Sequence, residues 1–193
     1  MIIFRVLCVT LCFASWVSSA GAVPSVRPVA GKGVLIIPAA AASRQAMIYE
    51  FPGVRRKEPV VPAELPSLSR SVAVKTEDAV VAFFAVRSGY ARVAVHASGE
   101  EGWLELRPGW QFVPWERFLK GRAVRLTPGT REQAARLREI PAESGAVTGT
   151  ASIGERLTVS EAYDDWVRVQ REGAIPGWLR WRDGDGRMLV SVE

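Results

Sequence analysis

Apolar and polar residues alternate most regularly between Glu155 and Trp181, in the stretch ERLTVSEAYDDWVRVQREGAIPGWLRW. Alternation with a period of two predicts short strands that each bury one face. Three such runs, separated by turn residues, lie at 155–161, 165–171 and 176–182. The Asp-Gly-Asp-Gly sequence that follows predicts a hairpin turn, with a closing strand at 188–192. We therefore expect this part of the chain to form an antiparallel sheet.

A weaker copy of the same pattern lies earlier in the chain. Tyr90-Ala-Arg-Val matches Trp166-Val-Arg-Val, and Gly102-Trp103-Leu matches Gly177-Trp178-Leu. An earlier apolar run also recurs, at positions 34 and 124, which are 90 residues apart, whereas the two Gly-Trp pairs are 75 apart. The first copy must therefore contain about 15 additional residues. We predict one module at 32–113, a connector with one helical turn at 114–121, and a second module at 122–193.

Each copy is expected to carry a short helix after its first strand, because residues 43–50 and 130–139 have helical character. Thr130 and Gln133 have the spacing of a capping box, in which hydroxyl and amide side chains satisfy backbone donors at a helix start. A proline after each stretch, Pro52 or Pro141, is expected to end the helix, since the residue before a proline is pushed out of the helical region.

The additional residues of the first copy are assigned to 53–70. This segment has three prolines, which favour extended, solvated backbone, and the basic run Arg55-Arg56-Lys57. Two interpretations remain open. The segment is either a mobile surface loop or a basic loop that contacts an anionic partner.

The run from Gly154 to Val169, followed by Pro176-Gly177-Trp178-Leu179, resembles the second half of a bacterial Src-homology-3-type (SH3b) domain. The first module matches less well, with Tyr90 in place of the first tryptophan. The resemblance implies a mainly β fold of two tandem small SH3-like β-barrels, in which sheet closure removes the exposed edges. Both modules differ from the family in the loop after the opening strand, so the peptide specificity of eukaryotic relatives does not carry over.

The first 22 residues are expected to be a signal peptide and not part of the fold. Arg5 precedes an apolar run at 6–17, and Ala20-Gly21-Ala22 suits a signal peptidase. We predict cleavage near Ala22 and an exported, periplasmic or extracytoplasmic protein. Membrane contact is expected only if this segment is not cleaved and anchors the chain. Both cysteines, Cys8 and Cys12, lie within it, so the mature chain is predicted to have no disulfide and no thiolate site.

The net charge and the small number of reactive side chains restrict the classes of function that this chain can have. The formal net charge of +5 suggests an anionic surface as partner, while export argues against nucleic acid. His96 is the only histidine, so no histidine-based triad can form within one chain. His96 with Glu100 and Glu101 flanks a turn, which we interpret as a solvated loop and not as a metal site. No catalytic residue, metal or cofactor is predicted.

The candidate ligand-binding residues are aromatic and basic side chains near the two Gly-Trp turns. They are Tyr90, Arg92, Trp103, Trp166, Arg168, Trp178 and Arg180. Aromatic rings stack on sugar rings, and arginine hydrogen-bonds carboxylates. The alternative is that Trp103 and Trp178 only pack the fold. Trp110 and Trp115, on either side of the start of the connector, are expected to pack between the modules.

The SH3b resemblance implies a non-enzymatic binding module of the cell envelope. The expected partner is a cell-wall glycan or peptide, or an envelope protein. The alternative is a protein-only scaffold subunit of a membrane-associated complex.

Overall fold

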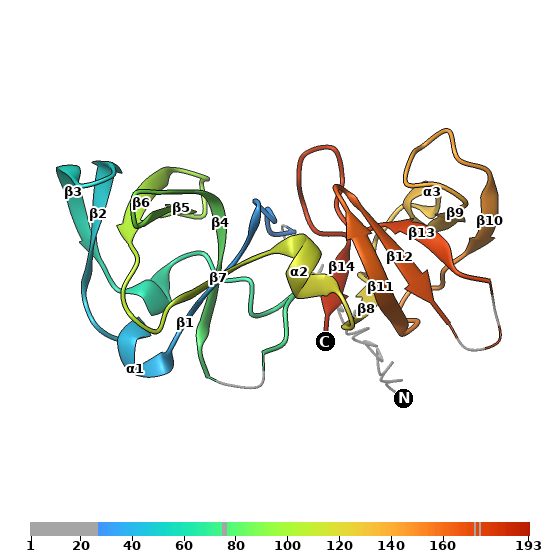
Figure 1. Cartoon of the computed structure of the whole chain (residues 1–193), viewed down its shortest axis with the longest axis horizontal. Helices are drawn as coiled ribbons and strands as arrows, with labels where there is room; N and C mark the ends of the chain where they lie inside the picture. The colour runs from blue at the N-terminus through green and yellow to red at the C-terminus, as the bar shows by residue number, and fades with distance from the viewer. Residues whose placement is uncertain (1–26, 75–76, 172, 174) are drawn as a thin grey trace, which may run out of the picture.

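The computed structural model describes residues 27–193, apart from 75–76, 172 and 174. The predicted signal peptide and both cysteines lie outside the described residues. The chain forms two antiparallel sheets of seven strands each, with only short helices, and the two sheets lie side by side in Figure 1. The predicted mainly β fold and tandem architecture are confirmed. No helix in the described part of the chain combines the length and hydrophobicity needed to cross a membrane.

The strands follow each other in two sets of seven. The first set is β1 (Gly33–Ile37), β2 (Ala46–Phe51), β3 (Val54–Val60), β4 (Ala79–Arg87), β5 (Tyr90–Ala94), β6 (Glu101–Glu105) and β7 (Gln111–Pro114). The second set is β8 (Ala123–Leu126), β9 (Arg136–Arg138), β10 (Val147–Thr150), β11 (Leu157–Tyr163), β12 (Trp166–Gln170), β13 (Gly177–Arg180) and β14 (Val190–Val192). The helices are α1 (Ala39–Ala42), the 3-10 turn η1 (Pro62–Glu64), α2 (Trp115–Leu119) and α3 (Glu132–Ala135).

Both sheets have the same topology. The strand order is β3-β2-β6-β5-β4-β1-β7 in the first sheet and β10-β9-β13-β12-β11-β8-β14 in the second. The register agrees as well, because Arg92 lies opposite Trp103 just as Arg168 lies opposite Trp178. Each sheet also has a bulge at the same place, between β4 and β5 and between β11 and β12. The sequence repeat is therefore a repeat of structure.

The glycine of each Gly-Trp pair is explained by a close neighbour on the next strand. A β-carbon at Gly102 would lie 2.3 Å from Cγ2 of Ile48 in β2. A β-carbon at Gly177 would lie 2.9 Å from Cβ of Leu137, at the equivalent place in β9. Both distances are too short for non-bonded carbon atoms. The close approach of two strands thus explains the glycine of each Gly-Trp pair.

A short helix follows the first strand of each module as predicted, but the predicted bounds, 43–50 and 130–139, are wrong. Only α1 and α3 are helical, with four residues each, and the chain then continues into β2 and β9. Residues 46–49 alternate between buried and half-buried positions, which is the period of a strand. Thr130 does not cap α3, because its hydroxyl donates to the Thr127 carbonyl at 2.7 Å. Pairing with neighbouring strands overrides the local helical preference.

The loop predicted at 53–70 is wrong in its first part only, because residues 61–70 are irregular apart from the turn η1 and a bridge at Ser67. Its first part is strand β3, paired along its length with β2. Its second part leads into a segment at 66–73, which we call the strap. Leu68 of the strap is 2% exposed and its amide donates to the Val80 carbonyl at 2.7 Å. Further along, the Ala73 amide donates to the Val192 carbonyl, and the Val192 amide donates to the Ser71 carbonyl, both at 2.7 Å.

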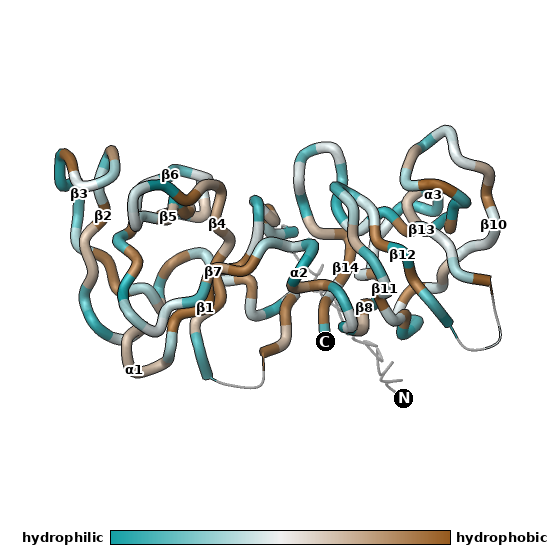
Figure 2. The backbone as a smooth tube through the Cα atoms, in the orientation of Figure 1, coloured by the Kyte–Doolittle hydropathy of each residue, from teal (hydrophilic) through white to brown (hydrophobic). Residues whose placement is uncertain are grey.

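The strap therefore belongs to both modules. It packs Leu68 under the first sheet and continues the second sheet beyond its edge strand β14, where Val72 pairs in parallel with Val192. The residues before β1 make a similar connection from the other side, because the Met188 amide donates to the Pro28 carbonyl at 3.0 Å and the Ala30 amide donates to the Gly186 carbonyl at 2.8 Å. Hydrophobic stretches in Figure 2 run along the strands of this central region, while the turn at 183–186 is hydrophilic.

A pair of tryptophans joins the modules at the connector. Trp115 of α2 packs on Trp181, with ring centroids 5.0 Å apart. Both indole N–H groups are satisfied, since Trp115 donates to the Ala30 carbonyl at 2.8 Å and Trp181 donates to the Asp164 carbonyl at 2.9 Å. Trp115 therefore packs between the modules as predicted. Trp110 does not, because it belongs to the core of the first sheet.

Truncation of the strap should destabilise the protein. We expect Leu68→Ala to lower the free energy of unfolding by about 2–5 kcal/mol, because it removes a buried side chain and leaves a cavity. The matched control is Ile175→Ala, at an aliphatic side chain that is 81% exposed, which should change stability by at most about 0.5 kcal/mol. Urea denaturation followed by tryptophan fluorescence measures both. Equal effects of the two substitutions would contradict a buried, structural strap.

The two motif glycines should tolerate no side chain. Gly102→Ala and Gly177→Ala are each expected to cost about 1–3 kcal/mol, as is typical when a well-packed core is overfilled. Gly184→Ala is the control, since a β-carbon there meets no atom within 4 Å. Thermal unfolding of the three variants tests this. A Gly102→Ala protein as stable as Gly184→Ala would show that the strands can move apart at no cost.

Candidate binding surface

One face of the first sheet gathers aromatic side chains around an arginine. Ala91 and Val93 of β5 belong to the buried core, so the alternating residues Tyr90 and Arg92 point to the opposite side. Arg92 lies opposite Trp103 of β6, and Trp103 lies opposite Tyr49 of β2. Tyr49, Tyr90, Arg92 and Trp103 thus form one continuous surface, which we call the first-sheet face. All four side chains are half-buried.

The rings of the first-sheet face are held by contacts with each other. Tyr49 and Tyr90 meet edge to face, with centroids 5.4 Å apart and an interplanar angle of 80°. The guanidinium carbon of Arg92 lies 6.0 Å from the centroid of the Trp103 ring, at the outer limit of a cation–π contact. These contacts fix the side chains before any ligand arrives.

Carboxylates border the same face. The Nε atom of Arg92 lies 3.1 Å from Oε2 of Glu101, and Glu105 lies directly opposite Tyr90. Burial, followed by the negative charge of Glu105 and the nearby Tyr49, raises the pKa of Tyr90 above its ordinary value. The phenol of Tyr90 is therefore a neutral hydrogen-bond donor throughout the physiological range.

The equivalent face of the second sheet is differently built. Trp166, Arg168, Trp178 and Arg180 lie together on the side away from the core, joined by Arg138 of β9 opposite Trp178. We call these five residues the second-sheet face. Trp166 and Trp178 are only 7% and 9% exposed. Their rings are covered and not presented to solvent, which agrees with the packing role weighed for Trp178.

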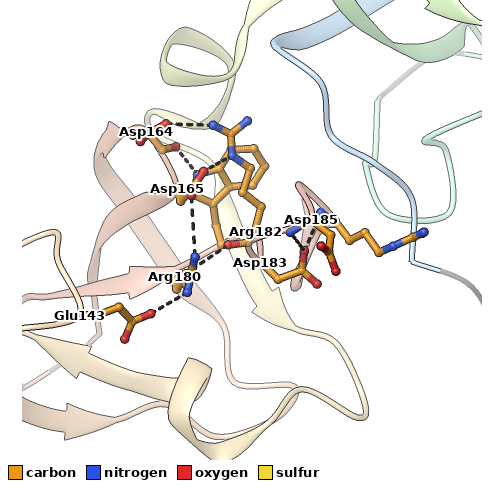
Figure 3. Close-up of polar contacts among 9 residues, drawn as sticks. Glu143, Asp164, Asp165, Arg180, Arg182, Asp183 and Asp185 are labelled. Atoms are coloured by element: carbon orange, nitrogen blue, oxygen red, sulfur yellow. Dashed lines mark hydrogen bonds and ion pairs between the residues drawn. The ribbon is translucent and has the colours of Figure 1, made fainter. Parts of the chain in front are cut away.

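A loop of the chain itself occupies this second-sheet face. Residues 139–146 connect β9 to β10 and place Glu143 between Arg138 and Arg180, of which Figure 3 shows the contact with Arg180. Its Oε1 atom lies 2.6 Å from Nη1 of Arg180 and its Oε2 atom lies 3.1 Å from Nη2 of Arg138. The first sheet has no such loop, because β2 turns directly into β3 at Pro52 and Gly53. The first-sheet face therefore lacks the loop that covers the second one, and its own arginine, Arg92, pairs with Glu101 of the neighbouring strand.

The acidic pair after β11 also serves a structural purpose. Asp164 and Asp165 both pair with Arg182, with 3.0 Å between Arg182 Nη2 and Asp164 Oδ1, as Figure 3 shows. Arg182 also donates from Nη1 to the Gly31 carbonyl, ahead of β1, at 2.9 Å. The pair holds an arginine that reaches from the second module to the first.

The predicted site residues are thus divided between two separate faces. Tyr90, Arg92 and Trp103 lie together on the first sheet, and the other four lie together on the second. Sequence reasoning missed Tyr49, which completes the first-sheet face. The signal was present in the alternation of residues 46–51, but that stretch was interpreted as a helix.

The basic run at 55–57 lies on the edge strand β3. Arg55 Nη1 is 2.9 Å from Glu50 Oε2, and Lys57 pairs with Glu100. The hydrogen bond between Lys57 and Glu100 raises the pKa of the lysine and lowers that of the glutamate. Arg56 is exposed and lies opposite Tyr49. Two of the three cations are therefore engaged by carboxylates, and Arg56 extends the first-sheet face.

His96, Glu100 and Glu101, which flank one turn, each lie close to oppositely charged or hydrogen-bonding side chains. His96 Nε2 lies 3.4 Å from Glu58 Oε1 and 3.8 Å from Glu100 Oε2, while Glu101 pairs with Arg92. Within the described ranges, no three or more His, Cys, Asp or Glu side chains are grouped so that they could hold a metal ion.

Comparison with known proteins assigns no family. No protein-family model matches the sequence, and a search of curated proteins finds no significant match.

The raised pKa of Tyr90 gives a pH test of the first-sheet face. The pKa of Tyr90 is higher in the folded protein than in the unfolded chain. The neutral phenol therefore stabilises the folded protein at neutral pH, and this stabilisation is lost as the pH rises through the folded-state pKa of Tyr90. Spectrophotometric titration should show an ionisation step with a pKa above the ordinary tyrosine value, and Tyr90→Phe should abolish that step. Glu105→Gln should shift the step partway down, because burial remains. An unshifted step in the Glu105→Gln protein would rule out Glu105 as a contributor.

Proposed function

We propose that this chain is an exported, non-catalytic binding protein of the bacterial cell envelope, which recognises cell-wall glycan or its attached peptide through the first-sheet face. The observation that carries the proposal is the group of Tyr49, Tyr90 and Trp103 beside Arg92, half-buried and fixed by mutual contacts. Preformed aromatic surfaces with a few polar groups at the edge suit ring-shaped or extended ligands.

The chemistry of the first-sheet face supports this class of ligand. Aromatic rings contact the apolar faces of sugar rings, and the bordering Arg92, Glu101 and Glu105 offer hydrogen bonds to hydroxyl, amide and carboxylate groups. The second-sheet face has tryptophans at the positions of Tyr90 and Trp103, but Glu143 pairs with two of its three arginines, Arg138 and Arg180. In this proposal the first module binds the ligand, and the second module holds the first module in position.

We infer that each sheet closes into a small SH3-like barrel. The antiparallel pairing in an identical order, and the resemblance of residues 154–179 to the SH3b pattern, support this inference. Signal-peptide cleavage near Ala22 and a periplasmic or extracytoplasmic location belong to the same proposal.

A second candidate function is a protein-only scaffold of a membrane-associated complex. It is favoured by exposed aliphatic side chains on the second module, namely Ile140, Val147, Ile153 and Ile175. Val147 begins the edge strand β10, which within the described residues pairs only with β9 and carries no charged residue. An uncharged edge of this kind suits the addition of an extended partner strand.

Retention on purified peptidoglycan tests the leading proposal. We expect the wild-type protein to co-sediment with the insoluble polymer, and Trp103→Ala and Tyr49→Ala each to lose about tenfold in affinity, since stacking on an aromatic side chain contributes on the order of 1–3 kcal/mol. Tyr163→Ala is the matched control, because Tyr163 is an exposed aromatic residue of the second module and should not matter.

Circular dichroism confirms that each variant is folded. If the wild type does not co-sediment, or if all three variants are retained equally, the glycan proposal is wrong. Crosslinking in intact cells then examines the scaffold, which requires a single stoichiometric protein partner and its loss on Val147→Arg.

A further inference from the structure

A cleft between the modules has a lining that is suited to an anion. Its volume is about 590 Å³ and its walls are the strap residues Ser67, Ser69, Arg70 and Ser71, the residues Arg27 and Pro28 before β1, and Thr127, Pro128 and Met188 of the second module. The lining thus combines two arginines with four hydroxyl side chains. It contains no carboxylate, although the chain as a whole has 20 acidic residues.

A neighbouring cleft shows that this composition is not general to the junction. That second cleft, of about 560 Å³, also contains Arg27, but Glu143, Asp183 and Asp185 face its arginines. Its charges are balanced within the protein. In the first cleft the charges of Arg27 and Arg70 are not balanced by any lining residue.

Both arginines of the first cleft have free donors. Arg27 donates from Nη2 to the Pro128 carbonyl at 3.3 Å and to the Thr130 hydroxyl at 3.4 Å. Within the described residues, its Nε and Nη1 groups have no acceptor. Arg70 is exposed and, in the same part of the chain, makes no hydrogen bond or ion pair. A guanidinium group has five N–H donors in a planar fork that matches the oxygens of phosphate.

Hydrogen bonds fix the backbone of the two segments that carry Arg27 and Arg70. The strap is tied on one side by Leu68 to the first sheet and on the other side by Ser71 and Ala73 to Val192. The hydroxyls of Ser67 and Ser69 lie 2.8 Å apart, and the Ser69 amide donates to Ser67 Oγ at 3.0 Å. Arg27 is fixed as well, because its carbonyl accepts from Arg187 at 2.8 Å. The cleft is therefore a built feature and not a chance gap between mobile loops.

We propose that this cleft binds a phosphate group, with Arg27 and Arg70 as charged donors and the Ser71 hydroxyl as a neutral one. Arginine pairs with phosphate through short, charge-assisted hydrogen bonds, which are about twice as strong as neutral ones. Ligands that carry such a group include free phosphorylated sugars or polyols and the headgroup of an anionic lipid. The site is independent of the first-sheet face, so either proposal can fail without the other.

Calorimetric titration of the full mature chain with inorganic phosphate and with glycerol 3-phosphate tests the soluble form of the ligand. Co-sedimentation with phosphatidylcholine vesicles, with and without phosphatidylglycerol, tests the lipid form. Arg70→Gln should weaken the observed binding about tenfold, because one charge-assisted contact is lost. Arg70 has no hydrogen bond or ion pair with any other residue of 27–193 that the structure describes, so the variant should unfold at the wild-type temperature.

The matched control is Arg117→Gln, which removes the same charge from an exposed arginine of α2 outside the cleft. Binding that is weakened by Arg70→Gln and unchanged by Arg117→Gln supports the site, and the arm in which it is seen identifies the source of the phosphate. Absence of binding in both arms overturns the proposal. Equal weakening by the two substitutions overturns it as well, because the effect would then reflect net charge alone.

Discussion

The junction between the modules, where Trp115 packs on Trp181, is the contact on which the rest of the structure depends. Small β domains bury little surface on their own and are correspondingly marginal. Here a single hydrophobic cluster includes Val34, Leu68 and Val80 from the first module together with Leu157, Val190 and other residues of the second. The strap adds backbone hydrogen bonds to the same region. The two faces and the central cleft therefore keep a fixed relation to each other, which neither module could provide alone.

Duplication explains which shared positions are structural and which are free to differ. Strand order, register, bulge and the glycines of the Gly-Trp pairs recur because both sheets pack over their cores in the same way. The loops attached to these strands are not constrained in this way. The second copy uses its longer β9–β10 loop to place Glu143 on its own arginines, whereas the first copy has a tight turn there and uses its extra length as the strap. The same strand framework thus carries one face whose Arg138 and Arg180 pair with a loop carboxylate, and one face without such a loop.

Local patterns predicted the elements that are determined by local chemistry. The alternation around Trp166 and Trp178 located β11, β12 and β13, and the glycines at 184 and 186 marked the turn before β14. The stretches at 43–50 and 130–139 were assigned to helices, but pairing of β2 with β6 and of β9 with β13 outweighs their helical preference. The prolines at 59, 62 and 66 suggested a solvated loop, but burial of Leu65 and Leu68 depends on surfaces formed by distant parts of the chain. Tyr49 was missed as a site residue for the same reason.

The bond between the strap and Val192 has a consequence for the order of assembly. Val192 is the second-to-last residue of the sequence, yet it accepts and donates the hydrogen bonds that hold Ser71 and Ala73. A chain that emerges from its amino terminus can pair β1 to β7 and bond Leu68 to Val80 early, but the bonds of Ser71 and Ala73 require β14. Removal of Val192 would accordingly break the hydrogen bonds of Ser71 and Ala73, which lie more than a hundred positions away in the sequence.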